Sequence, residues 1–237
     1  MKTFVVNLDK NVVRMAFMHE QLCRLKVDYE RLPAVYGKSL SIEERKSLFS
    51  AFRSFLAMGV RLSDGEIGCA LSHCEIYRRM DMEHLPIVLV LEDDVEIGDG
   101  LRQELLEIES FADVASPQVF LLSSHAVKEK KSGGIERIHG GTCTDGYVIT
   151  LPAARLIRKA NYPVVTVADR WRRWERRFGV KMYRVWPTVV RQKNETFGTD
   201  ISNNLRTAPI GVRKFLYKCV RAFEVFVDWL WYCVTGR

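Results

Sequence analysis

The sequence predicts an α/β protein in which helices pack on a mostly parallel sheet. Short apolar, β-branched segments alternate over about 150 residues with longer segments whose apolar residues recur every three or four positions. Hydrophobic residues make up 47% of the 237 residues and charged residues 27%, which is the balance of a globular protein. This composition excludes a disordered tail protein, a collagen-like repeat and a polytopic membrane protein.

Strands and helices alternate from the start of the chain. Thr3–Leu8 is a short apolar segment that ends in a turn, and Tyr29–Tyr36 is a second one, so both predict strands. Asn11–Lys26 and Ser41–Met58 carry apolar residues at helical spacing, and each predicts one amphipathic helix. This order indicates a layered α/β domain.

The alternation continues through the middle of the chain. Ser63, followed three residues later by Glu66, is the pattern of a capping box, so a helix is expected to begin there. Ile87–Leu91 is continuously apolar and predicts a buried strand. The same patterns predict the later elements, namely a helix at Leu101–Phe111, strands at Val119–Leu122 and Tyr147–Thr150, and a helix opening at Pro152.

Basic residues gather in the last third of the chain. Residues 1–154 hold 18 Lys and Arg against 23 Asp and Glu, whereas residues 155–237 hold 18 against 6. This distribution favours contact with nucleotide phosphates, a nucleic acid or an acidic membrane surface, although a solvated basic face has the same composition. The cysteines form no C-x-x-C pair and the first residues lack the apolar stretch of a signal peptide, so we expect reduced thiols and a cytoplasmic protein.

Three consecutive acids, Glu92, Asp93 and Asp94, follow the apolar strand directly. Unpaired charges are costly to bury, and ligands of open α/β sheets bind beyond the carboxyl ends of the strands. Carboxylate oxygens suit Mg²⁺ or Mn²⁺, which can neutralise a departing diphosphate. The acids therefore predict a divalent metal site, with Glu92 and Asp94 on one side. A solvated acidic turn before a helix is the alternative.

Cys69 and His73 lie one turn apart on the helix that begins at Ser63. A Cys and a His at this spacing can form a metal pair or a nucleophile with its base, although a Cys in a helix is more often a small core residue. Gly68 within the same helix costs up to about 1 kcal/mol relative to alanine, which indicates that another segment packs closely against it.

Six segments together resemble a known family. They are NLDKNVVR (Asn7–Arg14), AVYGKSL (Ala34–Leu40), SDGEIGCALSH (Ser63–His73), IVLVLEDDVEI (Ile87–Ile97), TDGYVIT (Thr144–Thr150) and VADRW (Val167–Trp171). In this order they resemble glycosyltransferase family 25, which includes lipooligosaccharide galactosyltransferases of Gram-negative bacteria and enzymes that glycosylate collagen. The resemblance covers residues 2–205, although the segment 123–139 is not diagnostic and VADRW matches loosely.

The resemblance implies a GT-A-like catalytic domain over residues 1–205 and a separate tail over 206–237. It implies transfer of a hexose, commonly from UDP-galactose, to a lipooligosaccharide or related glycan, with inversion and with Mn²⁺ or Mg²⁺ as the cofactor.

The resemblance also implies roles for individual residues. They are donor contacts at Asn7, Arg14, Ser72 and Asp93, metal ligands at Glu92 and Asp94, and catalytic groups at Glu66, His73 and Asp169. Asp169 is the candidate base, with Asp145 and Glu66 as rivals. The alternatives are that Arg14 is a surface cation, that His73 is a core histidine, and that Asp169 caps a helix at Arg170–Phe178.

Two other functions compete with the transferase. Cys69 and His73 would serve a thiol hydrolase. The WRRWERR segment at 171–177 would serve a nucleic-acid-binding module, because aromatic and arginine side chains can stack on bases and hold phosphates. No named nucleic-acid motif is present, so we expect no nucleic-acid partner.

The C-terminal segment Phe215–Val234 predicts an amphipathic helix. Its charged residues, at 218, 221, 224 and 228, form one narrow stripe on a helix, and these charges disfavour a transmembrane span. Trp229, Trp231 and Tyr232 suit the headgroup region of a bilayer, and nearby basic residues attract anionic lipid. We expect a peripheral protein on the inner face of the inner membrane, with packing of the helix on the catalytic domain as the alternative.

Overall fold

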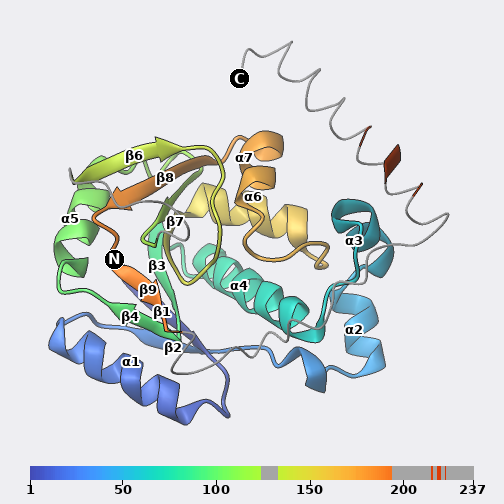
Figure 1. Cartoon of the computed structure of the whole chain (residues 1–237), viewed down its shortest axis with the longest axis horizontal. Helices are drawn as coiled ribbons and strands as arrows, with labels where there is room; N and C mark the ends of the chain where they lie inside the picture. The colour runs from blue at the N-terminus through green and yellow to red at the C-terminus, as the bar shows by residue number, and fades with distance from the viewer. Residues whose placement is uncertain (124–132, 194–214, 216–217, 220–221, 223–237) are drawn as a thin grey trace.

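The computed structural model describes residues 1–123, 133–193, 215, 218, 219 and 222 (Figure 1). The strands of this part are β1 (Lys2–Asn7), β2 (Glu30–Pro33), β3 (Ile87–Glu92), β4 (Val95–Ile97), β5 (Gln118–Leu121), β6 (Gly134–Ile138), β7 (Gly146–Thr150), β8 (Lys181–Trp186) and β9 (Val190–Gln192). The helices are α1 (Val12–Arg24), η1 (Gly37–Ser39), α2 (Ile42–Leu48), α3 (Ala51–Met58), α4 (Asp64–Met82), α5 (Leu101–Phe111), α6 (Leu151–Asn161) and α7 (Trp171–Phe178).

The main sheet has the strand order β2-β1-β3-β7-β5-β8-β6. β1 pairs in parallel with β2 and β3, and β5 pairs in parallel with β8. β7 runs antiparallel to β3 and β5, and β6 runs antiparallel to β8. All strands of this sheet except β6 and β7 therefore point the same way, which confirms the predicted α/β fold with a mostly parallel sheet.

Helices cover both faces of the sheet, because the strands are apolar on both sides. In β3, Val88 and Val90 belong to a core cluster with residues of α4, α6 and α7, whereas Leu89 and Leu91 belong to a second cluster with residues of α1 and α5. Figure 1 shows α4 and α6 side by side, in keeping with their many contacts. The two-residue period of the strands thus divides one apolar run between two cores.

The predicted helix Ser41–Met58 is in fact two helices, α2 and α3, so the prediction of a single helix was wrong. Ser41 begins α2 with a capping box. Phe49 then forms an isolated parallel bridge with Val164, and the Ser50 N–H donates to the Val164 carbonyl at 2.9 Å. Because the Ser50 N–H and the Leu48 carbonyl bond to Val164, they cannot join the i to i−4 bonds of a continuous helix.

The predicted strand Tyr29–Tyr36 is shorter than expected. β2 pairs with β1 only as far as Pro33, which lies opposite Asn7, the last residue of β1. The chain then continues to η1, which packs against α4.

The N-terminal end of α4 is fixed by close backbone packing. Ser63 and Glu66 form the predicted capping box. A Cβ atom placed on Gly68 would lie 2.4 Å from the Val35 carbonyl oxygen and 2.8 Å from the Gly37 nitrogen. This confirms the prediction that another segment packs closely against Gly68, and it brings the segment 34–38 beside Cys69 and the following turn of α4.

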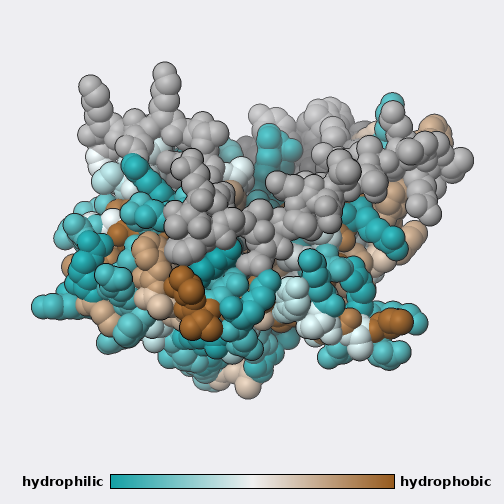
Figure 2. Space-filling view, turned by 60° about the horizontal axis from the view of Figure 1, so that its bottom comes forward, coloured by the Kyte–Doolittle hydropathy of each residue, from teal (hydrophilic) through white to brown (hydrophobic). Residues whose placement is uncertain are grey.

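The surface seen in Figure 2 is mostly hydrophilic, and its hydrophobic residues lie in small separate patches. No helix among the described residues is long and apolar enough to cross a membrane. The domain boundary at residue 205 and most of the tail 206–237, with its predicted amphipathic helix, lie outside the described residues. The four described tail residues, Phe215, Lys218, Cys219 and Ala222, are helical and exposed.

Candidate active site

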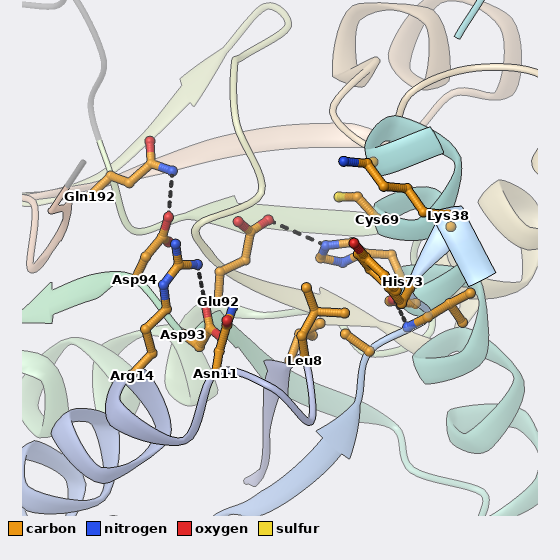
Figure 3. Close-up of a pocket in the computed structure, with 17 residues that line it drawn as sticks. Leu8, Asn11, Arg14, Lys38, Cys69, His73, Glu92, Asp93, Asp94 and Gln192 are labelled. Atoms are coloured by element: carbon orange, nitrogen blue, oxygen red, sulfur yellow. Dashed lines mark hydrogen bonds and ion pairs between the residues drawn. The ribbon is translucent and has the colours of Figure 1, made fainter. Parts of the chain in front are cut away.

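Two hollows meet at the carboxyl end of β3, where the three consecutive acids lie. The first hollow lies between the β1–α1 turn, the segment 34–38, α4 and the end of β3. The second lies between α4, the segment 143–145 and the segment 167–169. Cys69, Glu92 and Gln192 line both hollows, so the two form one continuous candidate site. Figure 3 shows the residues that line the first hollow.

The three acids bind partners on different elements. Glu92 accepts a hydrogen bond from Thr144 Oγ1 at 2.5 Å, and its Oε1 lies 3.5 Å from His73 Nε2. Asp94 accepts a hydrogen bond from Gln192 Nε2 at 3.1 Å. In Figure 3 the Glu92 carboxylate points toward His73 and the Asp94 carboxylate toward Gln192.

Asp93 accepts hydrogen bonds from Asn7 Nδ2 at 2.7 Å and from Arg14 at 3.1 Å. Asn7 also donates to the Asn11 carbonyl and accepts from Arg31 Nε, so its amide joins the end of β1 to the acids. Arg14 lines the first hollow, whereas Asn7 lines neither hollow. The structure therefore places Asn7 as a support for Asp93, and its predicted contact with a donor stays a prediction.

Burial and mutual repulsion distinguish the acids electrostatically. Burial, followed by the charge of Glu92, raises the pKa of Asp94 to about 6. Burial also raises the pKa of Asp93, although Asn7 and Arg14 oppose this effect. Burial alone would raise the pKa of Glu92, but interactions with His73 and Thr144 lower it overall. The surroundings thus lower the pKa of Glu92 and raise the pKa of the other two acids.

The side chains of α4 form one wall of both hollows. Glu66 lines the second hollow and accepts a hydrogen bond from the Ser63 N–H at 2.8 Å. Ser72 lines the first hollow, where its hydroxyl accepts from the Val35 N–H at 2.9 Å. Ser72 thus holds the segment that carries Tyr36 and Lys38 against the helix.

His73 is 1% exposed, and its Nδ1 lies 2.7 Å from the Tyr147 hydroxyl. Its Nε2 faces Glu92 and makes no hydrogen bond within the described part of the chain. His73 is therefore a buried residue with one ring nitrogen directed at the site. It combines features of the core histidine and of the site residue between which the sequence did not decide.

Asp169 lines the second hollow together with Asp145. The Cys143 N–H donates to Asp169 Oδ2 at 3.2 Å. The N-cap of α7 is Arg170 and has no side-chain capping bond, so the interpretation of Asp169 as that cap was wrong. Asp145 is 1% exposed and accepts a hydrogen bond from the Ser123 hydroxyl at 2.7 Å.

Thr144 and Gln192 bond directly to the acids but were not among the predicted site residues. Thr144 lies in a segment that the resemblance used, but nothing in the local pattern marks its hydroxyl as a partner of Glu92. Gln192 reaches Asp94 because β9 pairs with β4, and a short strand so late in the chain carries no sequence signal for this pairing.

The competing functions fit this structure poorly. Burial, reinforced by the charges of Glu92 and Asp169, raises the pKa of the Cys69 thiol well above its usual range, which opposes a thiolate nucleophile. Trp171 and Trp174 are fully buried in the core, so they cannot stack on bases. The interpretation of WRRWERR as a base-stacking segment was therefore wrong.

Comparison with known proteins identifies the family. The sequence model of glycosyltransferase family 25 (LPS biosynthesis protein) matches residues 1–171. The chain therefore belongs to glycosyltransferase family 25, and the predicted resemblance is confirmed.

Individual relatives cover the chain in part. A glycosyltransferase 25 family member of Drosophila melanogaster is 31% identical over 65% of this chain and 27% of its own length. A putative glycosyltransferase of Haemophilus influenzae is 26% identical over 70% of this chain and 60% of its own length. Procollagen galactosyltransferase 1-A of Xenopus laevis is 32% identical over 44% of this chain and 18% of its own length. The matches thus span less than two thirds of each relative.

A solved glycosyltransferase involved in the glycosylation of the major capsid of PBCV-1 aligns with 67% of this chain and 63% of its own, at a TM-score of 0.34 and 13% identity.

Proposed function

We propose that the protein transfers a hexose, specifically galactose from UDP-galactose, to a glycan acceptor in a GT-A-like active site. The observation that carries this proposal is the convergence of Glu92, Asp93 and Asp94 on two joined hollows at the carboxyl end of β3. A nucleotide sugar consists of a nucleoside and a sugar that are joined by a diphosphate, so its binding site must accommodate both ends with the diphosphate between them. The procollagen galactosyltransferase name of one relative supports galactose as the sugar.

The first hollow suits the nucleotide. Arg14 and Lys38 bring positive charge to its wall, and Tyr36 and Leu8 add apolar surface. Asp93 holds the Arg14 guanidinium, and a guanidinium fixed in this way is preorganised to meet phosphate oxygens. Asn7, Asp93 and Ser72 would then act on the donor by positioning Arg14 and the segment 34–38.

The acids suit Mn²⁺ or Mg²⁺, with Asp94 and Glu92 as the ligands. Asp94 Oδ1 is buried and has no hydrogen-bond partner among the described residues, and such an orphaned carboxylate oxygen fits a cation ligand. The pKa of Asp94 is raised by burial and by Glu92 although Arg14 opposes this effect, which fits a site where Arg14 alone does not balance the acids. When bound, the ion would neutralise charge on the departing diphosphate.

The second hollow suits the acceptor. An acceptor hydroxyl would attack the anomeric carbon from the side opposite the diphosphate, which inverts the configuration, while a carboxylate accepts its proton. Glu66 and Asp145 are buried, whereas Asp169 is half-buried and lines the second hollow. Among the bonds described above, Asp169 accepts only a longer hydrogen bond of 3.2 Å from the Cys143 N–H, so we assign the base to Asp169. His73 would support the reaction by facing Glu92 from the opposite wall.

The acceptor is proposed to be a lipooligosaccharide or a related glycan, which the family description as an LPS biosynthesis protein supports. Arg172, Arg176 and Arg177 of α7 are exposed and would attract phosphate or carboxylate groups on such a glycan. This acceptor implies a cytoplasmic enzyme that works at the inner face of the inner membrane.

The proposal is tested by slow hydrolysis of the donor. The full chain is incubated with Mn²⁺ and with UDP-galactose, UDP-glucose or a GDP-sugar, without acceptor, and the released nucleotide is measured. We expect release to be fastest from UDP-galactose. When a glycan acceptor is added, transfer should be lost in Asp169→Asn, because this variant lacks the carboxylate that accepts the proton of the acceptor hydroxyl. If the folded protein neither binds nor cleaves any nucleotide sugar, the proposal is contradicted.

A further inference from the structure

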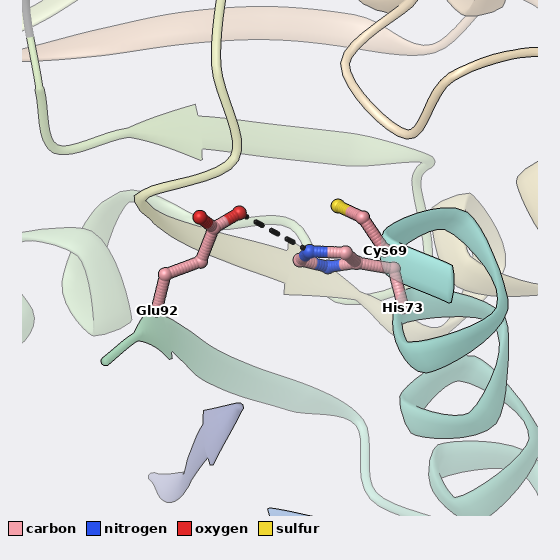
Figure 4. A group of neighbouring side chains, drawn as sticks. All are labelled: Cys69, His73 and Glu92. Carbon is pink, nitrogen blue, oxygen red and sulfur yellow. Dashed lines mark ion pairs between the residues drawn. The ribbon is translucent and has the colours of Figure 1, made fainter. Parts of the chain in front are cut away.

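Cys69, His73 and Glu92 form a mixed cluster of sulfur, nitrogen and oxygen ligands. The ligand atoms of the three residues all lie within 4.8 Å of one another. Cys69 and His73 come from one face of α4, where they are four residues apart, and Glu92 comes from the end of β3 (Figure 4). Two secondary structure elements of the core therefore hold all three side chains.

The distance between His73 and Glu92 is long for a direct hydrogen bond and suits a shared cation. His73 Nε2 lies 3.5 Å from Glu92 Oε1, and this nitrogen is buried without a hydrogen bond inside the described residues. Two ligand atoms held about 2.1 Å from one ion in tetrahedral geometry lie about 3.4 Å apart. The separation of the nitrogen and the oxygen thus matches two ligands of a shared ion.

Neighbouring side chains hold two of the ligands in place. The Tyr147 hydroxyl lies 2.7 Å from His73 Nδ1 and 3.0 Å from the Tyr77 hydroxyl. When Nδ1 carries the proton and donates it to Tyr147, Nε2 presents its lone pair to the cluster. The Thr144 hydroxyl donates to Glu92 Oε1, the same oxygen that faces His73, and so fixes its position. Metal-binding histidines and carboxylates commonly depend on outer partners of this kind.

We propose that Cys69, His73 and Glu92 form a binding site for a zinc-class divalent cation. A thiolate and an imidazole select such an ion over Mg²⁺ or Mn²⁺, which prefer oxygen ligands. On binding, the Cys69 S–H bond breaks, the sulfur binds the metal, and the proton passes to the solvent. Cys69 and Glu92 line both hollows, so a fourth ligand such as water could reach the ion from either hollow. Glu92 is also a proposed ligand of the Mn²⁺ or Mg²⁺ ion, so the two ions would share its carboxylate, but the binding measurements below need no transferase activity.

Cobalt(II) tests this site, because it replaces Zn²⁺ and absorbs light when it is bound to a thiolate. We expect one equivalent of Co²⁺ to produce a thiolate-to-metal charge-transfer band in the full-length wild type. Equimolar Zn²⁺ should remove the band, whereas a large excess of Mg²⁺ should not. No sugar nucleotide is present, so the result is independent of donor hydrolysis.

Cys69→Ser is the test variant, and it should abolish the charge-transfer band. Cys23→Ser is the matched control, because Cys23 also lies four residues from a histidine, His19, with 3.6 Å between sulfur and ring nitrogen. That pair is exposed and belongs to no cluster of three ligands among the described residues. The control should keep the band. A band that survives in Cys69→Ser, or that Cys23→Ser removes, overturns the proposal.

A second measurement covers the case in which Cys69→Ser does not fold. X-ray absorption of the zinc-loaded Cys23→Ser protein should show one sulfur neighbour at about 2.3 Å and nitrogen or oxygen neighbours at about 2.0 to 2.2 Å. A first shell without sulfur overturns the proposal, as does a folded wild-type protein that binds no Co²⁺.

Discussion

At the scale of residues, the site depends on how three adjacent carboxylates are divided among different partners. Glu92 faces His73 and Thr144, Asp93 holds Arg14, and Asp94 meets Gln192. Among these three acids, only Asp94 has a buried oxygen that makes no hydrogen bond to the described residues. The three acids are therefore expected to differ in what their removal does.

The first prediction concerns Asp94. Asp94→Asn should abolish transfer and leave the free energy of unfolding unchanged or higher, because it removes a buried charge whose pKa burial and Glu92 raise to about 6. EDTA should likewise stop the wild type, and Mn²⁺ should restore it. Transfer of labelled galactose and a denaturant titration measure the two effects.

Asp99→Asn is the control for Asp94, because the Asp99 side chain is 85% exposed and pairs only at the surface with Arg24. It should keep full activity. Full activity of the wild type in excess chelator would contradict the metal role of Asp94.

At the scale of elements, the contact between α4 and the segment 34–38 shapes the first hollow. We predict that Gly68→Ala destabilises the fold by about 2 kcal/mol or more, because the added methyl group meets backbone atoms of Val35 and Gly37 that cannot move aside easily. Thermal unfolding measures this effect. Donor binding should weaken as well, since Tyr36 and Lys38 lie on the displaced segment.

Gly98→Ala is the control for Gly68, because a Cβ atom there would find its nearest neighbour at 3.6 Å, an ordinary contact distance. Its stability should change by less than about 0.5 kcal/mol. Equal effects of the two substitutions would show that the close approach at Gly68 is unimportant.

Helix α5 carries a buried acid whose ionisation opposes folding. Glu104 is 5% exposed, its Oε2 has no hydrogen-bond partner among the described residues, and burial, followed by the charge of Glu107, raises its pKa to about 7. The folded state therefore holds a proton that the unfolded state releases near pH 4.5. The stabilisation is complete below this pH and is lost as the pH rises from there to about 7.

We predict that Glu104→Gln raises stability at pH 8 by about 1 to 2 kcal/mol relative to the wild type and has little effect at pH 4, where both side chains are neutral. Urea titrations at the two pH values measure the difference. A gain of the same size at both values would show that charge is not the cause.

At the scale of the whole molecule, the sequence of the tail bears on whether the protein binds a membrane surface. The sequence of Phe215–Val234 predicts an amphipathic helix with aromatic residues suited to a membrane interface. We predict that truncation after Asn204 leaves a folded enzyme that acts on soluble acceptors but no longer sediments with anionic vesicles. Circular dichroism and vesicle sedimentation at low and high salt measure this. Unfolding of the truncated protein would instead assign the tail to the core.

The sequence by itself determined the α/β class, the capping box at Ser63, the close approach at Gly68 and the family. The α/β class and the capping box follow from helical and strand periods and capping patterns, which depend on neighbours within a few residues. A glycine inside a helix marks a close approach locally, although the contacting residues Val35 and Gly37 lie in another segment. The family follows from several such segments in a fixed order. The acids after β3 were also visible from the local pattern. The break between α2 and α3 was not, because pairing with Val164, far along the chain, causes it.

Only the tertiary structure decided which partner each site residue has. Asn7 supports Asp93, Thr144 holds Glu92 and Gln192 reaches Asp94, and in each pair the residues lie at least 50 positions apart. Hydrogen bonds extend only about 3 Å, so such pairs form only after strands and helices have packed together. Burial, which raises the pKa of Asp94, is likewise a property of the assembled core, and no local pattern in the sequence encodes it.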